Sequence, residues 1–150
     1  MIKILFVCHG NICRSPMAEF IMKELVRRAG REKDFEIASA ATSTEELGNN
    51  MYPPACRMLA DKGIPFTRRA ARQITKADYS RYDMLIGMDE YNIKNLRRYY
   101  NGDPEGKIFM LLNRPVADPW YTDDFETTYN DLLEGCSRLL TQLQQPEDKG

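Results

Sequence analysis

Short apolar runs alternate with helical patterns along most of this 150-residue chain, and this alternation restricts the possible folds more than any other feature. Four runs have the length and composition of buried strands: residues 2–7, 35–40, 83–88 and 107–112. Strands that alternate with helices form a parallel sheet with helices on both faces. The sequence therefore predicts a single α/β domain over residues 1–150, built on a doubly wound, four-stranded parallel sheet.

Four helices are expected from the spacing of apolar residues and from end signals. The first is expected to begin at Ser15 and Pro16, as a capping hydroxyl followed by a proline, and to end before Gly30. The others are expected over residues 54–62, 89–100 and 125–143. The last has apolar residues at alternating steps of three and four, which is typical of a helix that covers a core.

Composition excludes several classes of function. The 21 basic and 22 acidic side chains give a formal charge of −1, which argues against a broad nucleic-acid-binding surface. The chain has one histidine, His9, and four cysteines: Cys8, Cys13, Cys56 and Cys136. This inventory cannot form a Cys/His zinc finger or a catalytic metal site with several histidines. The N-terminal apolar run is too short for a signal peptide or a membrane span. We expect a cytoplasmic protein with free thiols.

The loop after the first expected strand is the predicted binding site, because doubly wound sheets bind ligands beyond the carboxyl ends of their strands. Gly10 and Asn11 tolerate left-handed backbone, so this loop can curl into a ring with its N–H groups pointing inward. Such a ring at the N-terminus of a helix binds an anion, and phosphate in particular. The expected phosphate-binding residues are His9, Gly10, Asn11, Ile12, Cys13, Arg14 and Ser15.

Three side chains of this loop suit phosphate chemistry. Arg14 can clamp two phosphate oxygens with its planar guanidinium, which lysine cannot do. The inward N–H groups and the helix dipole favour the thiolate of Cys8, and Ser15 can donate a hydrogen bond to that sulfur. A thiolate below a bound phosphorus can attack it and form a phosphocysteine. The alternative, that Cys8 is only a small buried residue at the end of a strand, is disfavoured by the loop around it.

The segment from Val7 to Glu19, VCHGNICRSPMAE, resembles the signature of the low-molecular-weight protein tyrosine phosphatases. The resemblance continues through residues 39–43, 71–75, 88–89, 118–121 and 124–127. It implies a flavodoxin-like fold and hydrolysis of phosphotyrosine, in a protein or a small aryl phosphate, through a cysteinyl phosphate. It implies no metal and no cofactor, and Asn11 would hold the shape of the loop with help from Ser39. We expect a monomer or weak homodimer that binds neither nucleic acid nor membrane.

A carboxyl group is the expected proton donor for the leaving phenolate. The side chain of His9 should point away from the ring, because His9 directly follows the nucleophile. Asp118 is the best candidate, since it follows the fourth expected strand in a loop and precedes Pro119. The family resemblance also places its general acid at this Asp-Pro pair. After the first step Asp118 would act as the base on the attacking water.

The expected cleft has aromatic residues on its wall, and at one place on the wall the sequence differs from the usual sequence of the family. Trp120 is expected to be partly exposed and to line the cleft, together with Tyr121 and Ile12. The family commonly has a glycine and an aromatic residue after residues 39–43, but this chain has Thr44 and Glu45. Our hypothesis is that Glu45 lines the cleft and favours substrates with basic residues beside the phosphotyrosine.

Three other functions are weaker alternatives. A thiol-dependent arsenate reductase needs further cysteines after the third strand, and residues 77–95 contain none. Phosphoarginine phosphatases that resemble this chain typically have threonine where Ile12 stands, so Ile12 favours phosphotyrosine. A phosphopeptide-binding module without activity could lose Cys8 or Asp118, and both are present.

The remaining cysteines and one basic segment have simpler interpretations. Cys13 is close enough in sequence to form a reversible disulfide with Cys8 and protect it from overoxidation. Cys56 and Cys136 fall on expected helices and should pack in the core. The basic run over residues 68–72 is expected to be a solvated surface.

Overall fold

The computed structural model describes residues 1–144 of the chain, and within them four strands form one parallel sheet. The strands are β1 (Ile2–Cys8), β2 (Phe35–Ala41), β3 (Met84–Gly87) and β4 (Ile108–Met110). Their order in the sheet is β2-β1-β3-β4, with Cys8 of β1 opposite Ala41 of β2. This arrangement confirms the predicted flavodoxin-like, doubly wound fold, in which β1 is central and its carboxyl end lies between two neighbours.

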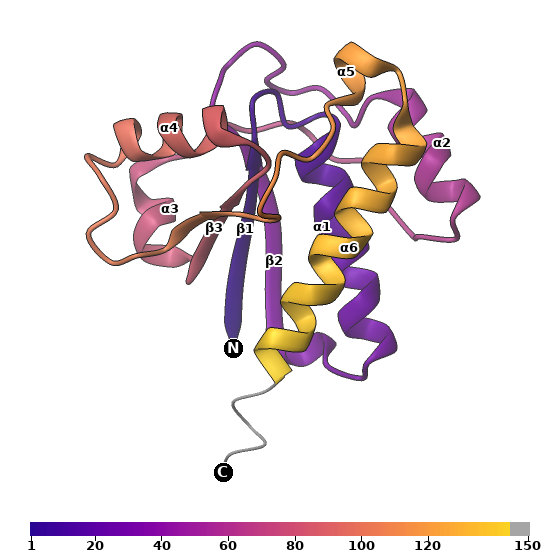
Figure 1. Ribbon diagram of the computed structural model, residues 1–150, viewed down its shortest axis with the longest axis horizontal. Helices are drawn as coiled ribbons and strands as arrows, with labels where there is room; N and C mark the ends of the chain where they lie inside the picture. Colours follow the sequence, from indigo (N-terminus) through magenta and orange to yellow (C-terminus); the bar gives the residue numbers. More distant parts are fainter. Residues whose placement is uncertain (145–150) are drawn as a thin grey trace.

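Helices cover both faces of the sheet (Figure 1). On one side lie α1 (Arg14–Arg28) and α6 (Phe125–Gln144), with α2 (Pro53–Asp61) beside them. On the other side lie α3 (Lys76–Arg81) and α4 (Glu90–Tyr99). A single turn, α5 (Pro119–Thr122), leads into α6, and a 3₁₀ turn (Glu32–Asp34) precedes β2. No helix within residues 1–144 combines the length and apolar character needed to cross a membrane.

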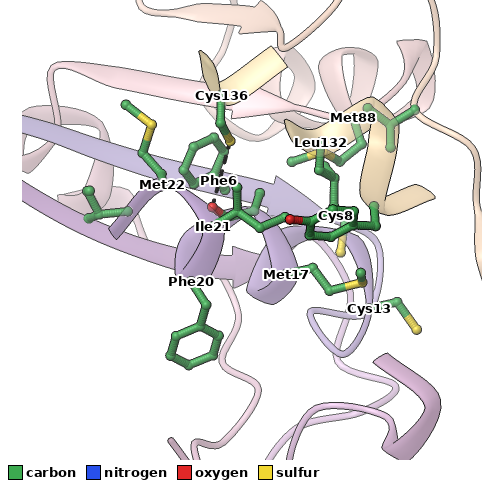
Figure 2. Packing of buried hydrophobic residues seen from close by; sticks show 14 of the residues in the cluster. Phe6, Cys8, Cys13, Met17, Phe20, Ile21, Met22, Met88, Leu132 and Cys136 are labelled. Atoms are coloured by element: carbon green, nitrogen blue, oxygen red, sulfur yellow. Dashed lines mark hydrogen bonds between the residues drawn. The ribbon is translucent and has the colours of Figure 1, made fainter. Parts of the chain in front are cut away.

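Strand β1 fixes the loop that follows it because β1 is buried on both faces. Side chains alternate across a strand, so Ile4 and Phe6 pack with α1 and α6, while Leu5 and Val7 pack with α3 and α4. Figure 2 shows the first of these layers, in which Phe6 lies among Ile21 of α1 and side chains of α6. Each such side chain contributes about 1.5–3 kcal/mol when it is fully buried. The loop at the carboxyl end of β1 therefore starts from a rigid base.

The main differences from the sequence predictions are at the ends of elements. Helix α1 begins at Arg14, and its N-cap residue, Cys13, makes no capping hydrogen bond with its side chain. Ser15 is therefore not the cap that the pattern predicted, because its hydroxyl is used inside the loop. Asp118 is the N-cap of α5 instead of a loop residue, with its Oδ1 accepting from the Trp120 N–H at 3.1 Å.

Helices α3 and α5 were not expected, since both are too short to show a helical period in the sequence. Thr75 and Asp78 form a capping box that starts α3. Strands β3 and β4 are also shorter at both ends than the apolar runs that predicted them.

Candidate active site

The loop over residues 8–15 wraps around the sulfur of Cys8, and the Cys8 residue as a whole is 4 % exposed. Asn11 has a φ of 60°, and this left-handed residue turns the backbone so that its N–H donates to Cys8 Sγ at 3.3 Å. Gly10 does not have a positive φ, so the predicted conformational role of this glycine is wrong and Asn11 alone makes the left-handed turn. Ser15 Oγ lies 3.0 Å from the same sulfur.

The amide of Asn11 determines which way the Ser15 hydroxyl points. Its Oδ1 accepts hydrogen bonds from Arg69 Nη2 and from the Arg72 N–H, which can only donate, so the orientation of the amide is fixed. Its Nδ2 then donates to Ser15 Oγ at 2.8 Å and to Ser39 Oγ at 3.0 Å. Because Ser15 Oγ accepts from Asn11, its own hydrogen is free to point to Cys8. The network therefore supplies a second donor to the sulfur.

A further layer of side chains holds this network in place. Ser39 Oγ donates to Glu19 Oε1 at 2.6 Å, which ties the loop to α1 and β2 at once. Asn11, at the centre, is fully buried. A buried polar group keeps its geometry when its hydrogen bonds are all made, so the loop is shaped before any ligand binds.

Residues 68–72 do not form the solvated surface that the sequence predicted. Arg68 is exposed, but Arg69 is partly buried against Asn11, and burial lowers the pKa of its guanidinium. Arg72 forms a two-pronged ion pair with Asp78, at 2.9 and 3.2 Å. The segment lies beside the end of β2, where the Ala41 N–H donates to the carbonyl of Arg72 at 2.7 Å. The position of Arg69 depends on this tertiary contact, and no local pattern reveals it.

Arg14 is held in place by groups from two other segments, the start of α4 at Asp89 and the loop over residues 116–118. It is 4 % exposed, and its Nη1 donates to the Val116 carbonyl at 3.0 Å and pairs with Asp89 Oδ2 at 2.9 Å. Its Nη2 lies 3.4 Å from Asp118 Oδ2. Asp89 also caps α4, since its Oδ1 accepts from the Asn92 N–H at 2.9 Å. Sequence reasoning missed the role of Asp89, although the Met88-Asp89 pair was part of the family resemblance.

One cavity of about 280 Å³ brings the predicted site residues together. Its lining residues are Cys8, His9, Gly10, Asn11, Ile12, Cys13, Arg14, Glu45, Glu46, Asp118, Trp120 and Tyr121. Ser15 and Ser39 lie behind this surface, in the network around Asn11.

The rim of the cavity has an aromatic side and an acidic side. Trp120 is 56 % exposed, as the sequence predicted for a cleft residue, and its ring lies 5.2 Å from that of Tyr52. Tyr121 is 85 % exposed. On the acidic side, His9 Nε2 and Glu45 Oε2 are 2.8 Å apart, so the imidazole points to the rim and away from the sulfur.

The thiols differ in their surroundings, and all four are free. Cys13 faces the same cavity as Cys8, and burial together with the nearby charge of Cys8 raises the pKa of Cys13 to about 12. It is therefore a neutral thiol at physiological pH. Cys136 is fully buried between α6 and α1 (Figure 2), as predicted. Cys56 is only partly buried, at the edge of the core.

Comparison with known proteins decides the family. The family model of low molecular weight phosphotyrosine protein phosphatases matches residues 3–149. The chain belongs to this family. Its phosphatase relatives are hydrolases, and the chain is an enzyme of the same class. The low molecular weight protein-tyrosine-phosphatase YfkJ of Bacillus subtilis is 36% identical over 152 residues, covering 97% of this chain and 97% of that protein.

Solved structures of family members have the same fold. The crystal structure of YfkJ has a TM-score of 0.94 over 97% of this chain and 96% of that chain. The low molecular weight protein tyrosine phosphatase of Streptococcus pyogenes is 41% identical, with a TM-score of 0.88 over 95% of this chain and 93% of that chain. A drosophila arginine phosphatase is 29% identical, with a TM-score of 0.87 over 96% of this chain and 99% of that chain. This structural neighbour is a phosphatase named for a different substrate.

Proposed function

We propose that this phosphatase hydrolyses phosphotyrosine, or a related aryl phosphate, through a phosphate ester of Cys8. The observation that carries the proposal is the pair of donors on the Cys8 sulfur, the Asn11 N–H at 3.3 Å and the Ser15 hydroxyl at 3.0 Å. Hydrogen bonds to a sulfur stabilise its negative charge and make it a better nucleophile and leaving group. A structural cysteine at the end of a strand needs neither donor.

In the first step the substrate phosphate occupies the ring of the 8–15 loop, with its phosphorus above Cys8 Sγ. The sulfur attacks phosphorus while the bond from phosphorus to the phenolic oxygen breaks. Arg14 stabilises the charge that spreads over the other phosphate oxygens in the transition state. Asp118 gives its proton to the leaving oxygen, so that phenol departs as a neutral molecule.

The arriving phosphate also changes the partners of Arg14. In the structure the guanidinium is shared between Asp89 and Asp118. A phosphate dianion is a stronger partner for arginine than a single carboxylate at 3.4 Å, so we expect it to displace Asp118. Asp89 keeps its contact on Nη1 and holds the guanidinium in place. Asp118 is then free to approach the leaving oxygen.

In the second step water attacks the phosphorus of the cysteinyl phosphate, and the carboxylate of Asp118 takes a proton from that water. The bond from phosphorus to sulfur breaks, which releases inorganic phosphate and restores the Cys8 thiolate. The hydroxyl of Ser15 donates to the departing sulfur. Cys8 is therefore the nucleophile in the first step and the leaving group in the second, and Asp118 is first the acid and then the base.

Phosphoarginine is the second candidate substrate, since a structural neighbour is an arginine phosphatase. Ile12 lines the cavity here and presents an apolar surface to the group that carries the phosphate. An aryl ring packs well on such a surface, whereas a charged guanidinium would lose water without gaining a hydrogen bond. This favours phosphotyrosine.

The experiment is a direct comparison of phosphotyrosine and phosphoarginine hydrolysis, with a chelator present, by the wild type and Ile12→Thr. We expect the wild type to prefer phosphotyrosine and the variant to lose part of that preference. Asp118→Ala should lower the rate about 10²- to 10⁴-fold with phenol as the leaving group, and far less with a strongly acidic phenol. Preferential hydrolysis of phosphoarginine by the wild type would contradict the assigned substrate.

A further inference from the structure

A second, polar cavity of about 460 Å³ adjoins the catalytic cavity, and His9 lines both. Its lining residues are His9, Thr42, Ser43, Ile74, Lys76, Asn95, Arg98, Tyr99 and Asn101. It lies between the loop after β2 and helix α4, which Figure 1 shows at the same end of the sheet. The lining contains cationic and neutral side chains and no carboxylate.

Within residues 1–144, neither Lys76 nor Arg98 forms an ion pair with a carboxylate. Lys76 Nζ donates to the carbonyl of Tyr99 and lies 4.0 Å from the centre of its ring, and both of these partners are uncharged. Arg98 is exposed and forms no ion pair within residues 1–144. Most other arginines here do have carboxylate partners, as Arg72 and Arg81 illustrate. The cavity therefore keeps a local positive charge that the net charge of the chain conceals.

The floor of the cavity is bonded directly to the catalytic loop. The Thr42 N–H donates to the carbonyl of Cys8 at 3.0 Å, and the Ser43 N–H and Oγ donate to that of His9 at 3.1 and 2.9 Å. Thr42 Oγ1 is buried and has no hydrogen-bond partner within the described residues. Polar atoms in such a position normally find a partner, so an oxygen-rich ligand or water is expected beside it. The cavity thus has a fixed position relative to Cys8.

We propose that this cavity binds an anionic group of the same substrate molecule, next to the phosphotyrosine. The group is a carboxylate or a second phosphate on a nearby residue, held by Lys76 and Arg98 while the phosphotyrosine is in the catalytic cavity. A peptide that leaves the catalytic cavity over His9 passes directly into this region. The inference rests on the proposed phosphotyrosine activity, and it makes an acidic flank a determinant of substrate choice.

The test compares kcat/KM for matched phosphotyrosine peptides with neutral, acidic or phosphoserine residues at each neighbouring position. The variant is Lys76→Gln with Arg98→Gln. The control is Lys94→Gln with Arg97→Gln, which removes the same charge from residues of α4 that line a different groove, beside β4. Phenyl phosphate reports the chemistry without any flank. The acidic and phosphoserine arms distinguish a carboxylate from a phosphate as the preferred group.

We expect the wild type to prefer the anionic peptides, and the Lys76/Arg98 variant to lose about fivefold on them at low salt. This loss should vanish near 1 M salt, where screening acts within about 3 Å. Activity on phenyl phosphate and on the neutral peptide should stay unchanged. An equal loss of kcat/KM on neutral and acidic peptides, or the same loss in the control variant, would overturn this inference and leave the proposed function standing. Failure of the wild type to hydrolyse phenyl phosphate would overturn the proposed function and this inference with it.

Discussion

Replacing Asn11 separates two contributions of this residue, its left-handed backbone and its hydrogen bonds. Asn11→Gly and Asn11→Ala both remove the four side-chain hydrogen bonds, to Ser15, Ser39, Arg69 and the Arg72 N–H. Glycine accepts the φ of 60° without strain, whereas alanine does not. The pair of variants therefore differs mainly in backbone strain.

The expected magnitudes follow from these contacts. Four hydrogen bonds at about 1 kcal/mol each give a loss of about 4 kcal/mol in the free energy of unfolding for Asn11→Gly. A left-handed alanine costs about 1 kcal/mol more, so Asn11→Ala should be less stable than Asn11→Gly by that amount. In a domain of this size each kcal/mol lowers Tm by about 3 °C, and urea unfolding measures both differences.

The same variants test how the network serves the sulfur. Without the Asn11 amide, nothing forces the Ser15 hydroxyl to point to Cys8. We expect kcat on phenyl phosphate to fall about 100-fold in both variants, with a smaller change in KM. If folded Asn11→Gly kept the wild-type kcat, the argument that this amide directs the hydroxyl would be refuted.

The remaining predictions concern oxidation, pH and substrate charge. After peroxide and then a reducing thiol, the wild type should recover its activity and Cys13→Ser should not, because only the former can trap oxidised Cys8 as a disulfide; equal irreversible loss would exclude this role for Cys13. Since burial raises the pKa of Cys13 to about 12, its reaction with oxidised Cys8 should speed up as the pH rises. Hydrogen bonds from Arg27 and Arg28 lower the pKa of Glu24 from 4.5 to about 2. The ionised Glu24 carboxylate therefore stabilises the fold fully above about pH 4.5, and this contribution is lost as the pH falls through about 2. Acid unfolding of the wild type and of Glu24→Gln should show the difference in stability between them disappear over this range. Glu45→Trp should lose a preference of less than about fivefold for a basic residue on the side of the phosphotyrosine that faces Glu45 and not Lys76 and Arg98, because an exposed charge contributes under about 1 kcal/mol; identical discrimination in both proteins would contradict the hypothesis.

Much of the fold could be predicted from local sequence patterns, because burial on both faces of a central strand leaves a continuous apolar run. Strand β1 shows such a run, and helix α6 shows the alternating steps of three and four of a helix that covers a core. Both were predicted to within one residue at each end. Helix α3 could not be predicted in the same way, since six residues are too few to show a period. Its stability depends on the capping box of Thr75 and on packing of Tyr79 in the core.

The residues that line the site were easier to predict than those that support it. Cys8, Arg14 and Ser15 lie in one short segment, so the sequence itself brings them together. Arg69 and Asp89 reach the loop from segments 58 and 75 residues after Asn11 and Arg14, and their contacts form only when the sheet assembles. A basic run looks the same in sequence whether it faces water or a buried amide, and this explains why the interpretation of residues 68–72 was wrong.

The central claim is that Cys8 carries the phosphoryl group between the two steps. The most direct test uses the Asp118→Ala variant and an aryl phosphate with a strongly acidic phenol, whose departure needs little protonation. Rapid acid quenching during turnover is followed by mass spectrometry of the peptide containing Cys8. Without Asp118 to activate water, the intermediate should accumulate, and the peptide should gain the mass of one phosphoryl group on Cys8. Cys8→Ser should show neither this adduct nor turnover. Full turnover by Cys8→Ser, or a phosphoryl group on another residue, would contradict the account.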